Sequence, residues 1–176
     1  MILGAIIAGG QSRRFGSDKA LASVDGKPLL DHVAEALAAQ TDAIIVVGRS
    51  WPGITSIADR PTLDQGPLGG LCAALHHAQA HGFETVLTVG CDILPLPAHL
   101  PALLAPGSAV VKGQQLIGLW RADLASALED YLESQPDRAI RGWMATAAVR
   151  TVTLDASFHN LNTPEDLAAF TKDQAA

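Results

Sequence analysis

The stretch that decides the fold is Ile2–Lys19, which reads ILGAIIAGGQSRRFGSDK. Its first part, Ile2–Ile7, is an apolar run typical of a buried strand, and a basic, glycine-rich loop follows it. Glycines directly after a strand let the backbone approach a ligand closely, and successive N–H groups with cationic side chains suit a polyphosphate. The spacing of Gly10 and Gly16 excludes the P-loop, which ends in Gly-Lys-Ser/Thr, and the loop contains no G-x-G-x-x-G. The sequence therefore predicts a nucleotide-phosphate loop of another kind.

Length and composition favour a single compact domain. The chain has 176 residues, of which 48% are hydrophobic, and this is enough for a sizeable core. The net charge of −6 argues against a broad nucleic-acid surface, which would need a basic stripe. No stretch approaches the roughly 18 continuous apolar residues that span a bilayer, and the N-terminus lacks the basic region of a secretory signal. We expect a cytoplasmic protein in which Cys72 and Cys91 are buried free thiols.

Strand-like and helix-like segments alternate along the chain, which predicts an α/β fold with a mostly parallel sheet. We expect one domain over residues 1–172 and a short polar tail over residues 173–176. The expected strands are Ile2–Ile7, Ala43–Gly48, Ile54–Ala58, Thr85–Gly90, Ala109–Val111, Leu116–Trp120 and Val149–Leu154. The expected helices are Leu29–Gln40, Leu68–His81, Ala98–Leu104, Asp123–Glu133, Arg138–Ala147 and Glu165–Thr171.

Residues that follow the expected strands are the first candidates for a site, because open α/β sheets bind ligands beyond the carboxyl ends of their strands. Asp92 follows Thr85–Gly90, where a carboxylate would suit a magnesium ion whose other ligands are phosphates and water. The alternative for Asp92 is a helix cap or a turn former, but the basic loop at the same sheet edge favours the metal. Asp59 follows the expected strand Ile54–Ala58. Gly66 precedes the expected helix Leu68–His81; it could offer a backbone N–H group to a ligand, or it could be part of an ordinary strand-to-helix connection.

Cations and amides complete the candidate site. Arg14 and Lys19 would neutralise negative charge as a phosphoryl or nucleotidyl group is transferred. Asn160 and Asn162 precede the expected C-terminal helix; Asn162 or its neighbour Thr163 can cap that helix, whereas Asn160 is freer to meet a ligand. The histidines show no ligand spacing with cysteines or carboxylates, so none is expected to be a catalyst or a metal ligand.

Five motifs together resemble the nucleotidyltransferases of molybdenum cofactor biosynthesis, most closely the molybdenum cofactor guanylyltransferase family. They are Ile7–Leu21, Gly26–Leu29, Gly66–Leu71, Cys91-Asp92 and Asn160–Leu167. They span nearly the whole chain in the order and spacing of that family. The first motif is shared with many sugar and alditol nucleotidyltransferases, whereas its combination with the Gly-Pro-Leu-x-Gly turn and the Asn-x-Asn-Thr-Pro ending is much more specific.

The resemblance implies a three-layer Rossmann-like nucleotidyltransferase fold. It also implies transfer of GMP from GTP to the phosphate of molybdopterin, with the guanine dinucleotide cofactor and pyrophosphate as products. The positions that match GTP-binding residues of the family are Ile7, Ala8, Gly9, Lys19, Asp59 and Asp92. Gly10 and Gly66 join this set through their expected backbone contacts. Asp92 also matches the magnesium ligand, Asn160 and Asn162 match positions near the pterin, and transient contact with cofactor-synthesis or target molybdoenzymes is a further expectation.

The chain departs from the family pattern at three places. Gly48 stands where some members have Asn, Pro95 comes one place later than usual after Asp92, and Gln114-Gln115 replace a common His or Pro. One alternative is a cytidylyltransferase that acts on molybdopterin, or another small sugar- or alditol-phosphate nucleotidyltransferase. Another alternative is a nucleotide-binding module without catalysis, which the presence of Lys19 and Asp92 argues against.

Overall fold

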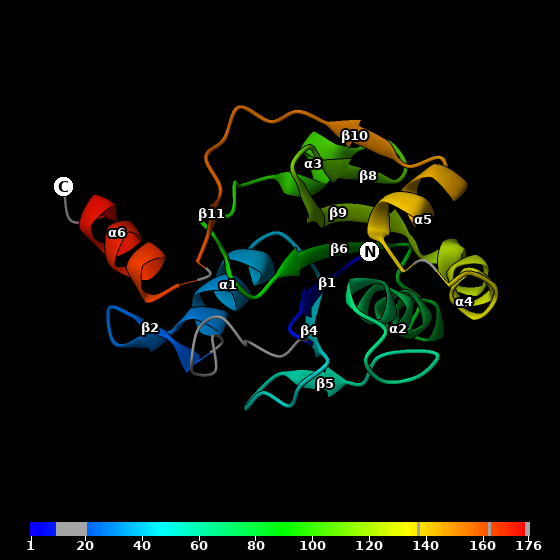
Figure 1. Ribbon diagram of the computed structural model, residues 1–176, viewed down its shortest axis with the longest axis horizontal. Helices are drawn as coiled ribbons and strands as arrows, with labels where there is room; N and C mark the ends of the chain where they lie inside the picture. Colours follow the sequence, from blue (N-terminus) through cyan, green and yellow to red (C-terminus); the bar gives the residue numbers. More distant parts are fainter. Residues whose placement is uncertain (10–20, 137, 162, 175–176) are drawn as a thin grey trace.

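The computed structural model describes residues 1–9, 21–136, 138–161 and 163–174, and within them seven strands form one central sheet (Figure 1). Strand β9 is antiparallel to both of its neighbours, and every other pairing in this sheet is parallel. The prediction of a mostly parallel α/β sheet is therefore confirmed. Across the sheet the strands are β10 (Arg150–Val152), β8 (Ala109–Val111), β9 (Gln114–Arg121), β6 (Thr85–Gly90), β1 (Ile2–Ile7), β4 (Ala43–Val47) and β5 (Thr55–Ile57).

The apolar run of β1 is buried on both faces of the sheet. Successive side chains of a strand point to opposite faces, so Leu3, Ala5 and Ile7 enter one apolar cluster while Ile6 and Ala8 enter the other. A strand covered on both faces reads as a continuous apolar run, which explains why this segment is easy to recognise in the sequence.

Helices cover both faces and make three layers, as expected. On one face lie α2 (Pro67–Ala80), α4 (Ala125–Ser134) and α5 (Ile140–Thr146), whose buried side chains pack with those of Leu3, Ala5 and Ile7. On the other lie α1 (Leu29–Ala38), α3 (Leu100–Leu104) and α6 (Pro164–Gln174). Figure 1 shows α2 and α4 side by side, and the two helices are in contact. No helix among the described residues is both long enough and apolar enough to cross a membrane.

Two short strand pairs were not predicted. Strands β2 (Ser23–Val24) and β3 (Lys27–Pro28) form an antiparallel pair joined by Asp25-Gly26, whose φ angles of 51° and 78° suit a two-residue hairpin turn. Strand β7 (Ile93–Leu94) pairs antiparallel with β11 (His159–Asn160), so that two distant parts of the chain meet at the end of β6.

The remaining helix boundaries differ from the expected ones by a few residues. A 3-10 turn, η2 (Ala122–Leu124), precedes α4 where the sequence predicted a continuous helix.

At the start of α6, Thr163 and Asp166 cap one another: the Asp166 N–H donates to Thr163 Oγ1 at 3.1 Å, and the Thr163 N–H donates to Asp166 Oδ2 at 2.9 Å. Thr163 is therefore the N-cap of this helix.

Candidate nucleotide-binding site

The strand order of the sheet reverses beside β1. The chain passes from β1 to β4 and β5 on one side and then returns to place β6 on the other side of β1. Open α/β sheets bind ligands outside the carboxyl ends of their strands at such a switch point. Ile7 pairs with Gly90, so Gly9 and Asp92 leave the sheet at the same level, two residues further on.

A cavity of about 560 Å³ lies at this edge. Its walls include Gly9 after β1, Gly48 after β4, Asp59 after β5 and Gly66 before α2. This volume falls within the range of small-molecule and cofactor sites, and the mixture of backbone, carboxylate and apolar atoms suits a nucleoside with polar edges.

Gly48 is required by the close approach of two strand ends. Its φ angle is +88°, and a Cβ atom at this position would lie 2.5 Å from the Gly9 Cα and 2.6 Å from the Gly9 backbone nitrogen. A side chain would therefore press on the backbone of Gly9, which cannot move aside like a flexible side chain. The departure from the family pattern at Gly48 is thus part of how the two loops pack in this chain.

We predict that Gly48→Ala lowers the free energy of unfolding by about 3 kcal/mol or more, because strain at positive φ adds to a backbone clash. Gly53→Ala is the matched control. Gly53 also has a positive φ, +76°, but a Cβ there meets no atom within 4 Å, so its expected loss is about 1–2 kcal/mol. Chemical denaturation measures both losses, and equal values would mean that the Gly9–Gly48 contact is unimportant.

Asp59 presents its carboxylate toward Gly9. A Cβ built on Gly9 would lie 3.6 Å from Asp59 Oδ1 and 3.7 Å from Oδ2, so a ligand on the Gly9 backbone meets this carboxylate. Burial raises the pKa of Asp59 above its ordinary value of 3.8, and the nearby carboxylate of Asp64 raises it further. A partly desolvated carboxylate gains from hydrogen-bond donors, and a nucleoside supplies hydroxyl and N–H groups.

The raised pKa predicts a stability change when Asp59 is replaced by Asn. The folded protein holds the Asp59 proton more tightly than the unfolded chain does, so the contribution of this group to stability falls as the pH rises through the raised pKa. Asp59→Asn should therefore have a higher Tm than the wild type at pH 7, and the difference should narrow as the pH falls toward 3.8. Thermal melts across this range test the effect, with Asp130→Asn on the exposed side of α4 as the control. A lower Tm for Asp59→Asn at pH 7 would contradict it.

Asp92 lies at the end of β6, where it is partly buried. A Cβ on Gly90 would come within 2.8 Å of Asp92 Oδ1, so the absence of a side chain at Gly90 leaves room for this carboxylate. The Asp92 backbone oxygen accepts a hydrogen bond from the Leu161 N–H at 2.9 Å, and Asn160 pairs with Ile93 in the β7–β11 ladder. The structure thus brings the Asp92 and Asn160 segments together through the β7–β11 pair, a contact that the sequence analysis did not predict. A carboxylate oxygen is a hard donor, so Asp92 fits a magnesium ion whose other ligands are phosphates and water.

The predicted backbone contacts occupy different positions around this edge. Ile7 and Ala8 have buried side chains, so these two residues can contact a nucleotide only through backbone atoms. The Ala8 N–H is already used, because it donates to the Val47 carbonyl at 2.9 Å. Gly66 is the N-cap of α2 and is exposed at the cavity. The other predicted site residues, which lie outside the described part of the chain, are Gly10, Arg14, Lys19 and Asn162.

Sequence reasoning missed several residues that line the cavity. Arg49 and Ser50 follow the expected strand of β4 and could have been found by the rule that selected Asp59 and Asp92. The other missed polar or large residues, Ser56, Leu63 and Asp64, carry no local motif.

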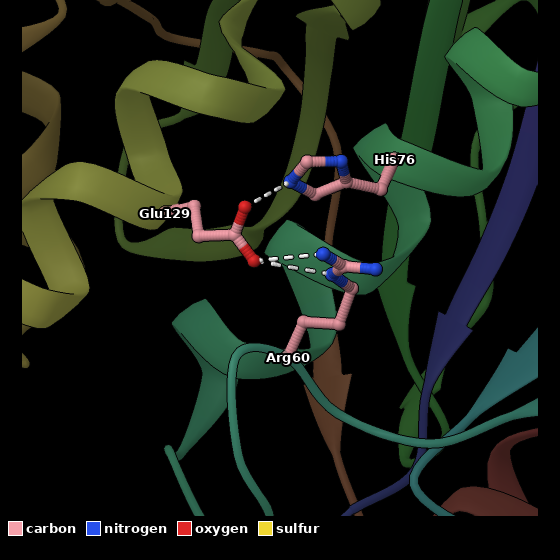
Figure 2. A network of polar contacts seen from close by, with 3 residues as sticks. All are labelled: Arg60, His76 and Glu129. Carbon is pink, nitrogen blue, oxygen red and sulfur yellow. Dashed lines mark hydrogen bonds and ion pairs between the residues drawn. The ribbon is translucent and has the colours of Figure 1, made fainter.

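One histidine has neighbours that the sequence analysis overlooked. The donor atoms of Cys72, His76 and Glu129 lie within 4.8 Å of one another. Burial, with a further contribution from Glu129, raises the pKa of the Cys72 thiol to about 12, whereas a metal needs the thiolate. Glu129 also forms hydrogen bonds with Arg60 (Figure 2), so Glu129 and His76 belong to a polar network that includes Arg60. Cys72 and Cys91 are both in the thiol form and not in a disulfide; Cys72 is buried as expected, whereas Cys91 is only partly buried.

A cavity of this size with mixed polar and apolar walls, at the switch point of a mostly parallel sheet, is typical of nucleotide-binding α/β proteins. Residues 4–151 match the family model described as the MobA-like NTP transferase domain. The chain therefore belongs to the MobA-like NTP transferase family, and it is a nucleotidyltransferase.

Named relatives agree with this assignment. The chain is 35% identical to molybdenum cofactor guanylyltransferase of Rhodobacter capsulatus, over 95% of this chain and 93% of the relative. It is 34% identical to the enzyme of the same name from Acidiphilium cryptum (strain JF-5), over 93% and 91% of the two chains. Among solved structures, molybdopterin-guanine dinucleotide biosynthesis protein A from Archaeoglobus fulgidus is similar, with a TM-score of 0.79, 20% identity and 99% coverage of both chains. At this identity the structural likeness supports the fold alone.

Proposed function

We propose that this chain transfers GMP from GTP to the phosphate of molybdopterin, forming the guanine dinucleotide cofactor and releasing pyrophosphate. The observation that carries the proposal is the likeness, over nearly its whole length, to two relatives named molybdenum cofactor guanylyltransferase. The cavity beside Gly9, Gly48 and Asp59 supports it, because its volume and its mixture of polar and apolar walls suit a nucleoside.

The reaction needs alignment and charge neutralisation more than proton transfer. A phosphate oxygen of the acceptor attacks the α-phosphorus of GTP; that P–O bond forms while the bond to the β-phosphate bridging oxygen breaks, and pyrophosphate leaves with the electron pair. The acceptor is a phosphate monoester with a second pKa near 6, so it is largely dianionic at pH 7. Such a nucleophile needs no side chain to remove a proton. The main barrier is repulsion between two anions, which positioning and nearby cations reduce.

Each candidate residue has a role in this scheme. Arg14 and Lys19 in the basic loop would neutralise charge on the phosphates during transfer. The backbone of Gly66, at the positive end of α2, would also stabilise a phosphate. Asp92 would hold magnesium, and Asn160, which pairs with Ile93 next to Asp92, would contact the acceptor together with Asn162. When bound, this ion would offset the charge on the leaving pyrophosphate.

A mechanism without a general base predicts that histidine replacements have small effects. His77 stacks on His81 with ring centroids 4.0 Å apart, and His99 is exposed before α3. His77→Gln and His99→Gln should each leave kcat within about threefold of the wild type, far below the 10²–10⁴-fold that general acid–base catalysis usually contributes. A hundredfold loss in either variant, with folding and GTP affinity intact, would overturn the mechanism.

The proposed function is tested by assaying pyrophosphate release with each of the four NTPs in the presence of magnesium and molybdopterin. Release should require both GTP and molybdopterin. Release with CTP in place of GTP would identify a cytidylyltransferase instead. Release with GTP that requires a sugar or alditol phosphate would contradict the proposed acceptor.

A further inference from the structure

A polar network joins the loop after β5 to helices α2 and α4 (Figure 2). Glu129 Oε1 accepts hydrogen bonds from Arg60 Nη2 at 2.9 Å and from Arg60 Nε at 3.3 Å. The other carboxylate oxygen, Oε2, lies 3.1 Å from His76 Nε2, an ion-pair distance. Glu129 therefore faces a partner on each side, one from the loop and one from α2.

Arg60 directly follows Asp59, the carboxylate of the proposed nucleotide site. The Arg60 backbone N–H donates to the Gly69 carbonyl at 3.2 Å, and a Cβ on Gly69 would lie 3.3 Å from the Asp59 Cβ. Asp59 lines the cavity, while the Arg60 side chain reaches Glu129 on α4. Arg60 is thus held by the first turn of α2 through its backbone and by α4 through its side chain, and Asp59 lies close to Gly69.

The spacing of residues on α2 explains why these contacts converge. Positions Gly69, Cys72 and His76 are separated by three and four residues, so they share one face of the helix. Glu129 is partly buried, with 23% of its side chain exposed. Its hydrogen bond with Arg60, helped by His76, holds the pKa of Glu129 below its ordinary value. The carboxylate is therefore ionised at neutral pH, as a firm contact with a guanidinium requires.

We propose that Glu129 is a positioning residue for nucleotide binding: by holding the Arg60 side chain, it fixes the adjacent Asp59 carboxylate at the wall of the cavity. This inference rests on the proposed function, because it takes Asp59 to contact the nucleotide. The Arg60 side chain is half exposed, but two of its nitrogens donate to one oxygen of Glu129, and a charge-assisted hydrogen bond is stronger than a neutral one. Its loss therefore frees the loop that carries Asp59. Glu129 lies on α4, and its link to the cavity runs through Arg60.

The first test compares three variants on α4. Glu129→Ala should raise KM for GTP by about tenfold with kcat within about threefold, because ground-state binding is what it loses. Glu129→Gln keeps an oxygen that can accept from Arg60, so the rise should be smaller, about threefold. Asp130→Ala, on the exposed side of the same helix, is the matched control and should leave both constants unchanged. An unchanged KM in Glu129→Ala would overturn the proposal.

A double-mutant cycle separates positioning from a general loss of stability. If Glu129 acts through Asp59, then Asp59→Asn raises KM for GTP, and adding Glu129→Ala to that variant produces no further rise. If the two effects on KM multiply, Glu129 has only a structural role and the proposal fails. The Glu129→Gln variant answers the same question should Glu129→Ala not fold.

The same cycle distinguishes failure of this inference from failure of the proposed function. If Asp59→Asn weakens GTP binding while neither Glu129 variant does, positioning by Glu129 is wrong and the role of Asp59 stands. If Asp59→Asn leaves KM for GTP unchanged, the proposed nucleotide site is itself wrong, and the inference is overturned with it.

Discussion

Lys19→Ala should lower kcat and raise KM for GTP together, with a combined loss of roughly 2–4 kcal/mol, the range for removal of one electrostatic donor from a transition state. Lys19 is the last residue of the basic motif that follows Ile2–Ile7 in the sequence, and we propose that its charge meets the α-phosphate of GTP. Charge on that phosphate increases as the two anions meet, so a cation there stabilises the transition state more than the ground state.

Steady-state kinetics with GTP and molybdopterin measure this effect. Lys27→Ala provides a matched control, because this substitution removes the same charge from the protein. The Lys27 ammonium forms an ion pair with Glu35 of α1. The kcat of Lys27→Ala should stay within about twofold of the wild type, as expected for an exposed ion pair. A rise in KM without any change in kcat for Lys19→Ala would mean that Lys19 contributes to ground-state binding alone.

Asp92→Asn should reduce turnover by at least about tenfold while the fold is retained. The two side chains are nearly isosteric, and the space over Gly90 accommodates either of them. The backbone hydrogen bond from Leu161 to the Asp92 oxygen does not depend on the side chain, so the β7–β11 contact should survive. The variant loses a negative charge, and with it affinity for a hard cation.

A magnesium titration of kcat, together with a thermal melt, tests this prediction. The variant should melt near the wild-type temperature and need more magnesium for half-maximal turnover. Near-normal turnover at saturating magnesium would remove Asp92 from the mechanism.

Local apolar pattern allowed most of the sheet to be predicted. The bounds of β1 and β6 were predicted correctly, because both strands are covered on two faces: β1 reads as a continuous apolar run, and in β6 only the threonines interrupt it. The β7–β11 pair was missed, because each strand has two residues and its pairing depends on contact between distant segments. No periodicity can develop over two residues.

The candidate site shows the same division. Asp59 and Asp92 could be selected because each follows a strand whose carboxyl end must lie at the binding edge. The link between Arg60 and Glu129 could not be predicted, since the two residues are 69 positions apart and meet only when α4 packs on α2. The tight contact of Gly48 with Gly9 likewise depends on the pairing of β4 with β1. In the sequence, Gly48 was recognised only as a departure from the family pattern, and its contact with Gly9 could not be predicted.

The most direct test of the account follows the two ends of the triphosphate in a single turnover. GTP that is radiolabelled at the α-phosphate, and separately at the γ-phosphate, is incubated with the enzyme, magnesium and molybdopterin, and the products are separated. The account predicts that the α-label enters the pterin dinucleotide and the γ-label enters pyrophosphate. Transfer of the γ-label to molybdopterin, or release of the α-label as free GMP without a dinucleotide, would contradict it.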